Sequence, residues 1–171
     1  GIRGSDTHSI MFTDVQVPKE NRIGEDGFGF SFAMKTLSGG RIGIAAQALG
    51  IASGAYELAL KYSKERKAFG KPLLDNQVIH FKLAEHQTEL ESLRALIYKA
   101  CDRFVDGKDV TMLASMAKLK SGRLIREVSD SCLQFWGGMG YTMENPVSQQ
   151  FRDGRLPVSY THLRAHETSQ H

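Results

Sequence analysis

Residues 39–70 read GGRIGIAAQALGIASGAYELALKYSKERKAFG, and this stretch decides the fold. Small residues recur every four positions at Ala46, Gly50 and Gly54, which places them on one face of a helix. A second set follows at three- and four-residue steps: Leu49, Ala52, Tyr56 and Ala59. The spacing therefore predicts a long helix that is closely buried.

Glycines inside this helix indicate a close neighbour. Because glycine costs about 1 kcal/mol relative to alanine in a helix interior, Gly43, Gly50 and Gly54 are best explained by a second backbone that comes near. We expect the helix to end where positive charge gathers, since cations stabilise the negative end of the helix dipole. Its last turns carry Lys61, Lys64, Arg66 and Lys67, and residues 70–72 (Gly-Lys-Pro) prevent continuation.

The composition is that of one ordinary globular domain. The chain has 171 residues, of which 41% are hydrophobic and 24% charged. A net charge of +3, from 22 basic and 19 acidic residues, is too weak to indicate a nucleic-acid partner, although the basic residues at 61–71 could bind an anion. Cys101 and Cys132 have no second ligand at metal spacing, so we expect two reduced, buried thiols and no structural zinc.

Residues 42–60 approach the length of a membrane span and carry small-xxx-small spacing. Gln47, Ser53 and Glu57 interrupt this run. Because it contains a charged residue and amphipathic helices flank it, we interpret it as a core helix and expect no membrane span.

Short β-leaning runs precede the helical region. Residues 9–12 and 15–17 are rich in β-branched and apolar residues and lead to Pro18, which predicts the last strands of a sheet. Residues 24–29 (GEDGFG) form a turn-rich linker and mark a domain boundary. A short helix is then expected before the Gly39-Gly40 break, on the spacing of Phe30, Ala33, Met34 and Leu37.

Two further long helices follow the central one. One is expected to start after a cap at Asp75 or Asn76 and to stop at Gly107, and the next to start near Asp109 or Thr111. Its apolar positions lead into residues 134–140 (QFWGGMG), and residues 147–152 predict one more helical turn. Three long helices with short connections predict a mainly α fold, an antiparallel up-and-down bundle preceded by a short β segment.

Four motifs, in this order and spacing, resemble the acyl-CoA dehydrogenase family: Gly39-Gly40-Arg41, residues 65–70 (ERKAFG), Gln77, and residues 134–141 (QFWGGMGY). The opening GIRGSDTHSIMFTDVQVPKENRIGEDGFGF resembles the end of that family's middle β-domain and its passage into the C-terminal helical domain. The resemblance covers residues 1 to about 156. It implies three parts: 1–26 as the end of the β-domain with its linker, 27–156 as the helical bundle, and 157–171 as a tail.

The resemblance implies a flavoenzyme that oxidises an acyl-CoA thioester to the trans-2-enoyl-CoA and passes electrons to electron-transfer flavoprotein. In that family the C-terminal helices form the core of a homotetramer, and each bundle reaches the FAD of a neighbouring subunit. Six positions carry over as FAD-binding candidates: Arg66, Phe69, Gln77, Gln134, Gly137 and Gly138.

The residue types agree with these implied roles. A planar guanidinium matches phosphate oxygens, so Arg66 would meet the FAD pyrophosphate, and consecutive glycines would let the backbone approach the adenosine portion. Taken singly, each signal has a plainer interpretation, since KERK is typical of a solvated helix end, GGMG of a C-cap and Trp136 of a core residue. Their joint spacing favours the cofactor.

A second set of positions, Ser38, Gly39, Gly40 and Arg41, matches the family's segment that lines the acyl-CoA site. In isovaleryl- and long-chain-type members the catalytic Glu stands immediately before this Arg, where this chain has Gly40. In short- and medium-chain-type members it lies in a Tyr-Glu-Gly-Thr stretch, which residues 151–155 (FRDGR) approach before the pattern is lost. We therefore assign no catalytic base and expect this chain by itself to be inactive.

From Pro157 the chain reads PVSYTHLRAHETSQH, which departs from the family and which we interpret as a non-native tail, so Glu167 is not assigned as the base. His162 and His166 have helical i, i+4 spacing but no third ligand, so no metal site is expected. Because the chain lacks an initiator Met and opens as if inside a domain, we interpret it as a fragment.

The two halves of the chain resemble different branches of the family. The part up to about Pro72 is similar to short- or branched-chain members, whereas residues 114–146 are similar to the citronellyl- and long-chain-like branch. A hybrid of two genes is one hypothesis that explains this.

Two other functions stay open. A non-catalytic helical scaffold or oligomerisation module would suit the small-residue helix equally well, although it would not need Arg66, Gln77 and residues 134–138 together. An acyl-CoA oxidase would share the fold and differ in how oxygen is admitted. The location implied is the cytoplasm in a bacterium or the mitochondrial matrix in a eukaryote.

Overall fold

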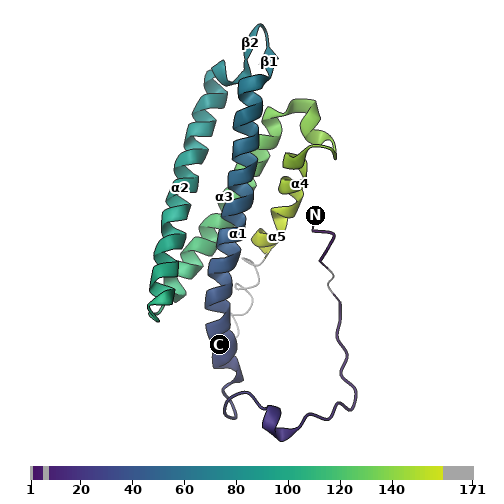
Figure 1. Ribbon diagram of the computed structural model, residues 1–171, viewed down its shortest axis with the longest axis vertical. Coiled ribbons are helices and arrows are strands. Elements are labelled where there is room, and N and C mark those ends of the chain that lie inside the picture. Colours follow the sequence, from purple (N-terminus) through teal and green to yellow (C-terminus); the bar gives the residue numbers. More distant parts are fainter. Residues whose placement is uncertain (1, 6–7, 160–171) are drawn as a thin grey trace.

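The computed structural model describes residues 2–5 and 8–159. Three long helices lie side by side and alternate in direction: α1 (Gly29–Glu65), α2 (Gln77–Val105) and α3 (Thr111–Phe135) (Figure 1). Two short helices, α4 (Pro146–Asp153) and α5 (Arg155–Ser159), pack against α1 and α3. The predicted mainly α, antiparallel bundle is confirmed.

Three short 3-10 helices complete the described elements: η1 (Lys19–Asn21), η2 (Leu73–Asp75) and η3 (Gly137–Tyr141). The expected helix limits hold closely, because α2 follows Asn76 and α3 begins at Thr111. Asn145 caps α4, with its Oδ1 accepting a hydrogen bond of 2.9 Å from the backbone N of Val147.

The strands lie elsewhere than the sequence predicts. A hairpin of β1 (Lys67–Ala68) and β2 (Lys71–Pro72) joins α1 to α2. Residues 9–12 and 15–17, predicted as strands, form none and are exposed. A strand needs a neighbour for its backbone N–H and C=O groups, and the described part of the chain brings none to this segment. In Figure 1 the segment runs as an extended trace away from the bundle.

The predicted break at Gly39-Gly40 is wrong, because α1 continues through both glycines for 37 residues in all. A glycine keeps its backbone N–H and costs only about 1 kcal/mol in a helix. Burial of the turns that follow, beginning with Ile42 and Ala45, offsets that cost.

The core is built on a face of alanines. On α1 five of them are at most 1% exposed: Ala45, Ala48, Ala52, Ala55 and Ala59. Larger side chains from the other helices fill the space against them, among them Leu90, Leu93, Ile125 and Val128. Small side chains on α1 therefore allow α2 and α3 to approach it closely.

The glycines of α1 do not serve the purpose that the sequence suggests. Gly43 and Gly50 face open space, where an added β-carbon would meet nothing within 4 Å. At Gly54 a β-carbon would lie 2.9 Å from Gln150 Nε2, which is a side chain of α4 and not a backbone. The expected backbone contact is therefore wrong, and alanines carry the close packing. Among the other predicted core positions, Leu49 is buried and Tyr56 half-buried.

By length and composition α1 could cross a membrane, since an 18-residue window within it has a mean hydropathy of 1.2. A share of 39% of that window is buried inside the bundle. The core helix of a soluble protein passes the same test, and the alanine face of α1 forms the core here.

The predicted tail at 157–171 falls largely outside the described residues, and His162, His166 and Glu167 lie there. Its first described residues belong to α5, where Pro157 is fully buried. The Pro157 carbonyl accepts a hydrogen bond from Lys118 Nζ on α3. Burial lowers the pKa of Lys118. Pro157, the first residue beyond the predicted boundary, thus still packs on the bundle.

Candidate functional site

Arg66 lies at the point where α1 gives way to the hairpin. Its backbone N donates to the carbonyl of Tyr62 at 2.8 Å, and its own carbonyl accepts from the backbone N of Leu73 at 2.9 Å. Both backbone groups are thus fixed, while the side chain is exposed. Among the described residues none forms a hydrogen bond or ion pair with its guanidinium. Arg66 therefore presents a free cation from a fixed base.

Phe69 stands at the tip of the hairpin in an unfavourable backbone conformation. Its φ is +53° and that of Gly70 is +81°, as a two-residue turn with both central φ angles positive requires. Glycine adopts this conformation freely, but an L-residue with a side chain pays about 1 kcal/mol or more. The Phe69 ring is also fully exposed. Backbone strain of this kind collects at binding sites, so Phe69 is a candidate contact group.

A glycine turn closes α3. Gly137 has a φ of +56°, and neither it nor Gly138 has an atom within 4 Å of the place where a β-carbon would stand. Gly140 differs, because a β-carbon there would lie 2.5 Å from the carbonyl oxygen of Leu133. Gly140 thus lets the turn fold back over the end of α3, whereas Gly137 and Gly138 leave backbone open to a ligand.

The six FAD-binding candidates lie at the same end of the bundle. Arg66, Phe69 and Gln77 belong to the α1–hairpin–α2 connection, and the rest to the end of α3 and to η3, which Figure 1 shows at the same end. The rings of Tyr62 and Trp136 stack with centroids 4.0 Å apart and planes 12° apart. This contact joins α1 to the residue before Gly137.

Sequence reasoning assigned no role to Tyr62, considered Trp136 only as a core residue or as part of the cofactor motif, and did not pair the two. The available signal was position alone: Tyr62 lies one helical turn before Arg66, and Trp136 immediately precedes the glycines. Because the two rings come from different helices, spacing along the sequence could not pair them.

Residues 38–41 lie far from this end. Arg41 and Arg66 are 25 residues apart on α1, which is roughly 37 Å at 1.5 Å per residue. Ser38 Oγ donates to the Met34 carbonyl at 3.4 Å, and a β-carbon on Gly39 would touch the ring of Phe104 at 3.4 Å. Gly40 faces open space and Arg41 is half-buried. The chain thus does not bring the two predicted groups of site residues together.

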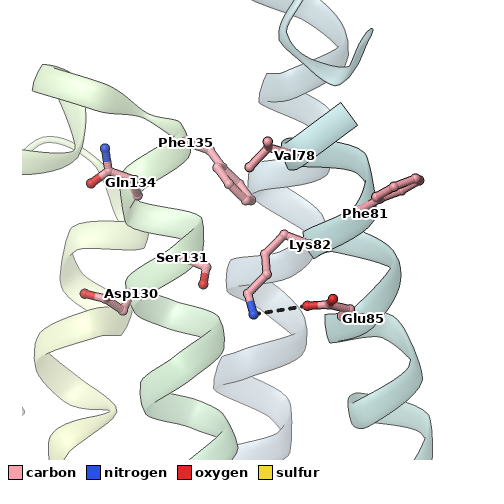
Figure 2. A pocket seen from close by; sticks show the side chains of 8 residues that line it. All are labelled: Val78, Phe81, Lys82, Glu85, Asp130, Ser131, Gln134 and Phe135. Carbon is pink, nitrogen blue, oxygen red and sulfur yellow. Dashed lines mark hydrogen bonds and ion pairs between the residues drawn. The ribbon is translucent and has the colours of Figure 1, made fainter. Parts of the chain in front are cut away.

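A groove of about 430 Å³ runs between α2 and α3 (Figure 2). It is lined by Val78, Phe81, Lys82, Glu85, Asp130, Ser131, Gln134 and Phe135. Lys82 Nζ donates to Glu127 and Glu85 carboxylate oxygens at 3.1 Å each, and these bonds raise the pKa of Lys82. Since its charge is already compensated, Lys82 offers little to an anion. Sequence reasoning missed this groove, although Val78, Phe81, Lys82 and Glu85 have the spacing of one helix face.

One of the two cysteines is too deeply buried to act as a nucleophile. Cys132 is fully buried, and burial raises the pKa of its thiol to about 12. The reactive form of cysteine is the thiolate, so Cys132 is inert near neutral pH. Both cysteines are free thiols, but only Cys132 is buried as predicted, since Cys101 is half-buried.

The residues at the hairpin end fit a ligand that carries phosphates and a planar ring. An uncompensated guanidinium matches phosphate oxygens, two open glycines admit close backbone approach, and an exposed aromatic ring offers a flat apolar contact. These groups share one end of the bundle, which meets the chemical requirement for a dinucleotide such as FAD.

The sequence profile of a family described as "Acyl-CoA dehydrogenase, C-terminal domain" matches residues 27–160. Among curated proteins, "Acyl-CoA dehydrogenase, short-chain specific" of Megasphaera elsdenii is 46% identical over 160 residues, 94% of this chain and 42% of that protein. "Caffeyl-CoA reductase-Etf complex subunit CarC" of Acetobacterium woodii is 44% identical over the same shares of the two chains.

A solved structure agrees with these sequence matches. Butyryl-CoA dehydrogenase from Megasphaera elsdenii superimposes with a TM-score of 0.86 at 47% identity, over 88% of this chain and 39% of that one. The chain therefore spans about two fifths of the length of the relatives that it matches.

Proposed function

The chain belongs to the acyl-CoA dehydrogenase family, and on that premise we propose that it is the helical part of an FAD-dependent enzyme that oxidises acyl-CoA to trans-2-enoyl-CoA. The observation that carries this proposal is the convergence of Arg66 and the Gly137-Gly138 turn at one end of the bundle. The short-chain and butyryl-CoA dehydrogenases among its relatives favour a short acyl group.

At the hairpin end, the Arg66 guanidinium would pair with the pyrophosphate of FAD, and the Phe69 ring and Gln77 would contact the cofactor. Gln134, Gly137 and Gly138 would admit its adenosine portion. All three residues are exposed, and no atom lies within 4 Å of the place where a β-carbon would stand on either glycine. When bound, FAD supplies the electron acceptor for oxidation of the CH–CH bond.

Ser38, Gly39, Gly40 and Arg41 would line the acyl-CoA site. They are separated from Arg66 by roughly 37 Å along one helix. This separation suits an assembly with shared sites, in which one region of a bundle would bind the substrate of its own subunit and the other region would bind the cofactor of a neighbouring subunit. A homotetramer, as the resemblance implies, would provide such shared sites. In the family the catalytic Glu stands at one of two positions. This chain has Gly40 at the first of them and does not show the Tyr-Glu-Gly-Thr pattern of the second, so we expect this chain alone not to oxidise substrate.

The partners, the location and the domain limits follow from the same family membership. Electron-transfer flavoprotein would accept the electrons, and one relative is named as a subunit of an Etf complex. The location would be bacterial cytoplasm or the mitochondrial matrix, with α1 as a core helix and not a membrane span. Residues 1–26 would be the end of the β-domain and residues 27–156 the helical domain, a division supported by the start of α1 at Gly29.

A non-catalytic scaffold remains the alternative of another class. It would explain the alanine core of α1, but it gives no reason for a strained, exposed Phe69 beside an uncompensated Arg66. An acyl-CoA oxidase would share these residues and differ in its reaction with oxygen.

The decisive test is FAD binding by the full-length protein that contains this chain. Hydrogen bonds to charged groups contribute about 1.5–3 kcal/mol, so Arg66→Gln should raise the FAD Kd roughly 10- to 100-fold. Lys71→Gln, which removes another exposed cation of the hairpin, should leave the Kd within about twofold. Kd would be measured by titrating the apoprotein with FAD and following flavin fluorescence.

A second readout separates the candidate functions. Anaerobic addition of butyryl-CoA should bleach the flavin absorbance of the wild-type protein, and reoxidation by electron-transfer flavoprotein should be faster than by oxygen. Rapid reoxidation by oxygen would favour the oxidase. A wild-type protein that binds no FAD would favour the scaffold.

A further inference from the structure

We propose that the Tyr62–Trp136 stack is a positioning contact that holds the two halves of the FAD site in register. This inference rests on the proposed function. One half is Arg66 with the hairpin, and the other is the Gly137-Gly138 turn. Arg66 and Gly137 are 71 residues apart in the sequence, and the stack joins their segments at a centroid distance of 4.0 Å.

On the α1 side, the stacked ring of Tyr62 lies one helical turn before Arg66, which carries the cation. The carbonyl of Tyr62 accepts the hydrogen bond from Arg66 N, at 2.8 Å, which ends the helix. The stacked ring fixes the last turn of α1 from its side. A shift of Tyr62 would therefore move the backbone from which the guanidinium extends.

On the α3 side, the stack acts next to the open backbone. The backbone N of Trp136 donates to the Leu133 carbonyl at 3.1 Å and so closes α3. Gly137 follows directly, with its φ of +56°. Two glycines in succession have no side chains to fix their direction, so the preceding ring is the nearest side chain that can set it.

The indole of Trp136 contributes through its ring and not through its N–H. Its Nε1 is buried and has no hydrogen-bond partner among the described residues. A buried unpaired donor lowers stability, so the benefit of tryptophan here lies in the aromatic contact with Tyr62. Near-parallel stacking at 12° fixes both distance and orientation, which an aliphatic contact would not.

The test uses the full-length protein and separates the ring from its polar atoms. Trp136→Leu and Tyr62→Leu remove the stack, whereas Trp136→Phe and Tyr62→Phe keep an aromatic ring on each side. Tyr62→Phe removes only the hydroxyl group, and Trp136→Phe replaces the indole by a smaller ring without the N–H. Aromatic pairs contribute enough to change an equilibrium constant roughly 2- to 10-fold. We expect both leucine variants to raise the FAD Kd by roughly that factor and both phenylalanine variants to stay within about twofold of wild type.

A double-mutant cycle distinguishes positioning from general damage. If the stack acts through Arg66, the Kd change caused by Trp136→Leu should shrink at least twofold when Arg66 is already Gln, because independent sites add. Tyr98→Leu, which removes an exposed ring on α2, is the matched control and should leave the FAD Kd unchanged. The KM for acyl-CoA at saturating FAD should stay constant in all variants.

Each other outcome overturns the inference. Leucine variants that bind FAD like wild type, or effects that add fully with Arg66→Gln, would show that the stack only supports the fold. Tyr62 and Trp136 are both half-buried. Because the two leucine variants remove the same stack from different helices, either one carries the test where the other lowers the yield of folded protein. A wild-type protein that binds no FAD would contradict the proposed function itself, which is a different result.

Discussion

The two regions of α1 that carry candidate site residues are built in different ways. At its C-terminal end three segments converge, namely the hairpin, the start of α2 and the turn after α3, and an aromatic stack joins α1 to the residue that follows α3. At residues 38–41 the ring of Phe104 on α2 lies against Gly39, Ser38 and Arg41 are half-buried, and open space lies beside Gly40. The first region thus joins segments from several parts of the chain, whereas the second is a single stretch of helix. The proposed contacts to FAD at the first region thus come from segments that this one chain brings together.

The sharpest way to break this comparison is a methyl group at Gly140. A β-carbon there would lie 2.5 Å from the Leu133 carbonyl oxygen, and backbone cannot move aside cheaply. Gly140→Ala should therefore lower the free energy of unfolding by roughly 1–3 kcal/mol, as overpacking does, and disturb the glycine turn. Urea denaturation followed by circular dichroism measures this.

Gly138→Ala is the matched control for that substitution, since it adds the same methyl two residues away, in open space. It should change stability by less than about 0.5 kcal/mol. Equal effects at the two positions would mean that the turn is not held against α3 at Gly140.

The opposite sign is expected at the other region. Gly40 lies inside α1 with nothing near it, so Gly40→Ala should raise the free energy of unfolding by up to about 1 kcal/mol through helix propensity. Gly43→Ala, also in open space, should do the same. Loss of stability at either position, in the same urea experiment, would show that this face is already packed against something.

The helical bundle was predictable because its apolar residues repeat with the period of a helix. Apolar residues at three- and four-residue steps predicted all three long helices, and buried Leu49, Ala52 and Ala59 confirm the inward face. The Gly39-Gly40 break was mispredicted because local propensity is weak beside the burial of a long helix. The strands at 9–17 were mispredicted because a strand depends on partners that propensity does not contain.

The candidate site was predictable only through resemblance. No local rule relates Arg66 to Gly137, since a lone cation at a helix end and a glycine after a helix are common. Their shared place at one end follows from the up-and-down topology. The Tyr62–Trp136 stack depends on how α1 and α3 are each oriented about their own axes, and sequence spacing does not determine that orientation. The roles of these residues in binding remain predictions.

A finer test is possible between the two regions of α1, where α2 packs against α3, because a histidine is buried there. His86 is 1% exposed, and its Nε2 has no partner among the described residues. Burial, and then the charge of Lys82, lower its pKa, while Glu127 on α3 and Glu85 on α2 act in the opposite direction. The folded state therefore keeps His86 neutral at a pH where the unfolded chain already binds a proton.

The sign of the pH effect follows from this difference. The unfolded histidine has a pKa of about 6.5, so stability should fall as pH falls below about 6.5 toward the lower folded value, because the unfolded state then binds more protons. His86→Leu and His86→Gln remove the titrating group and should flatten the pH dependence of the free energy of unfolding between about pH 6.5 and 5. If both variants keep the wild-type slope, the acid sensitivity of the bundle lies in another group. If the slope flattens while the FAD affinity at neutral pH is unchanged, the packing of α2 against α3 around His86 contributes to the fold independently of the cofactor end. The difference between the two regions of α1 then does not depend on this packing and belongs to the regions themselves.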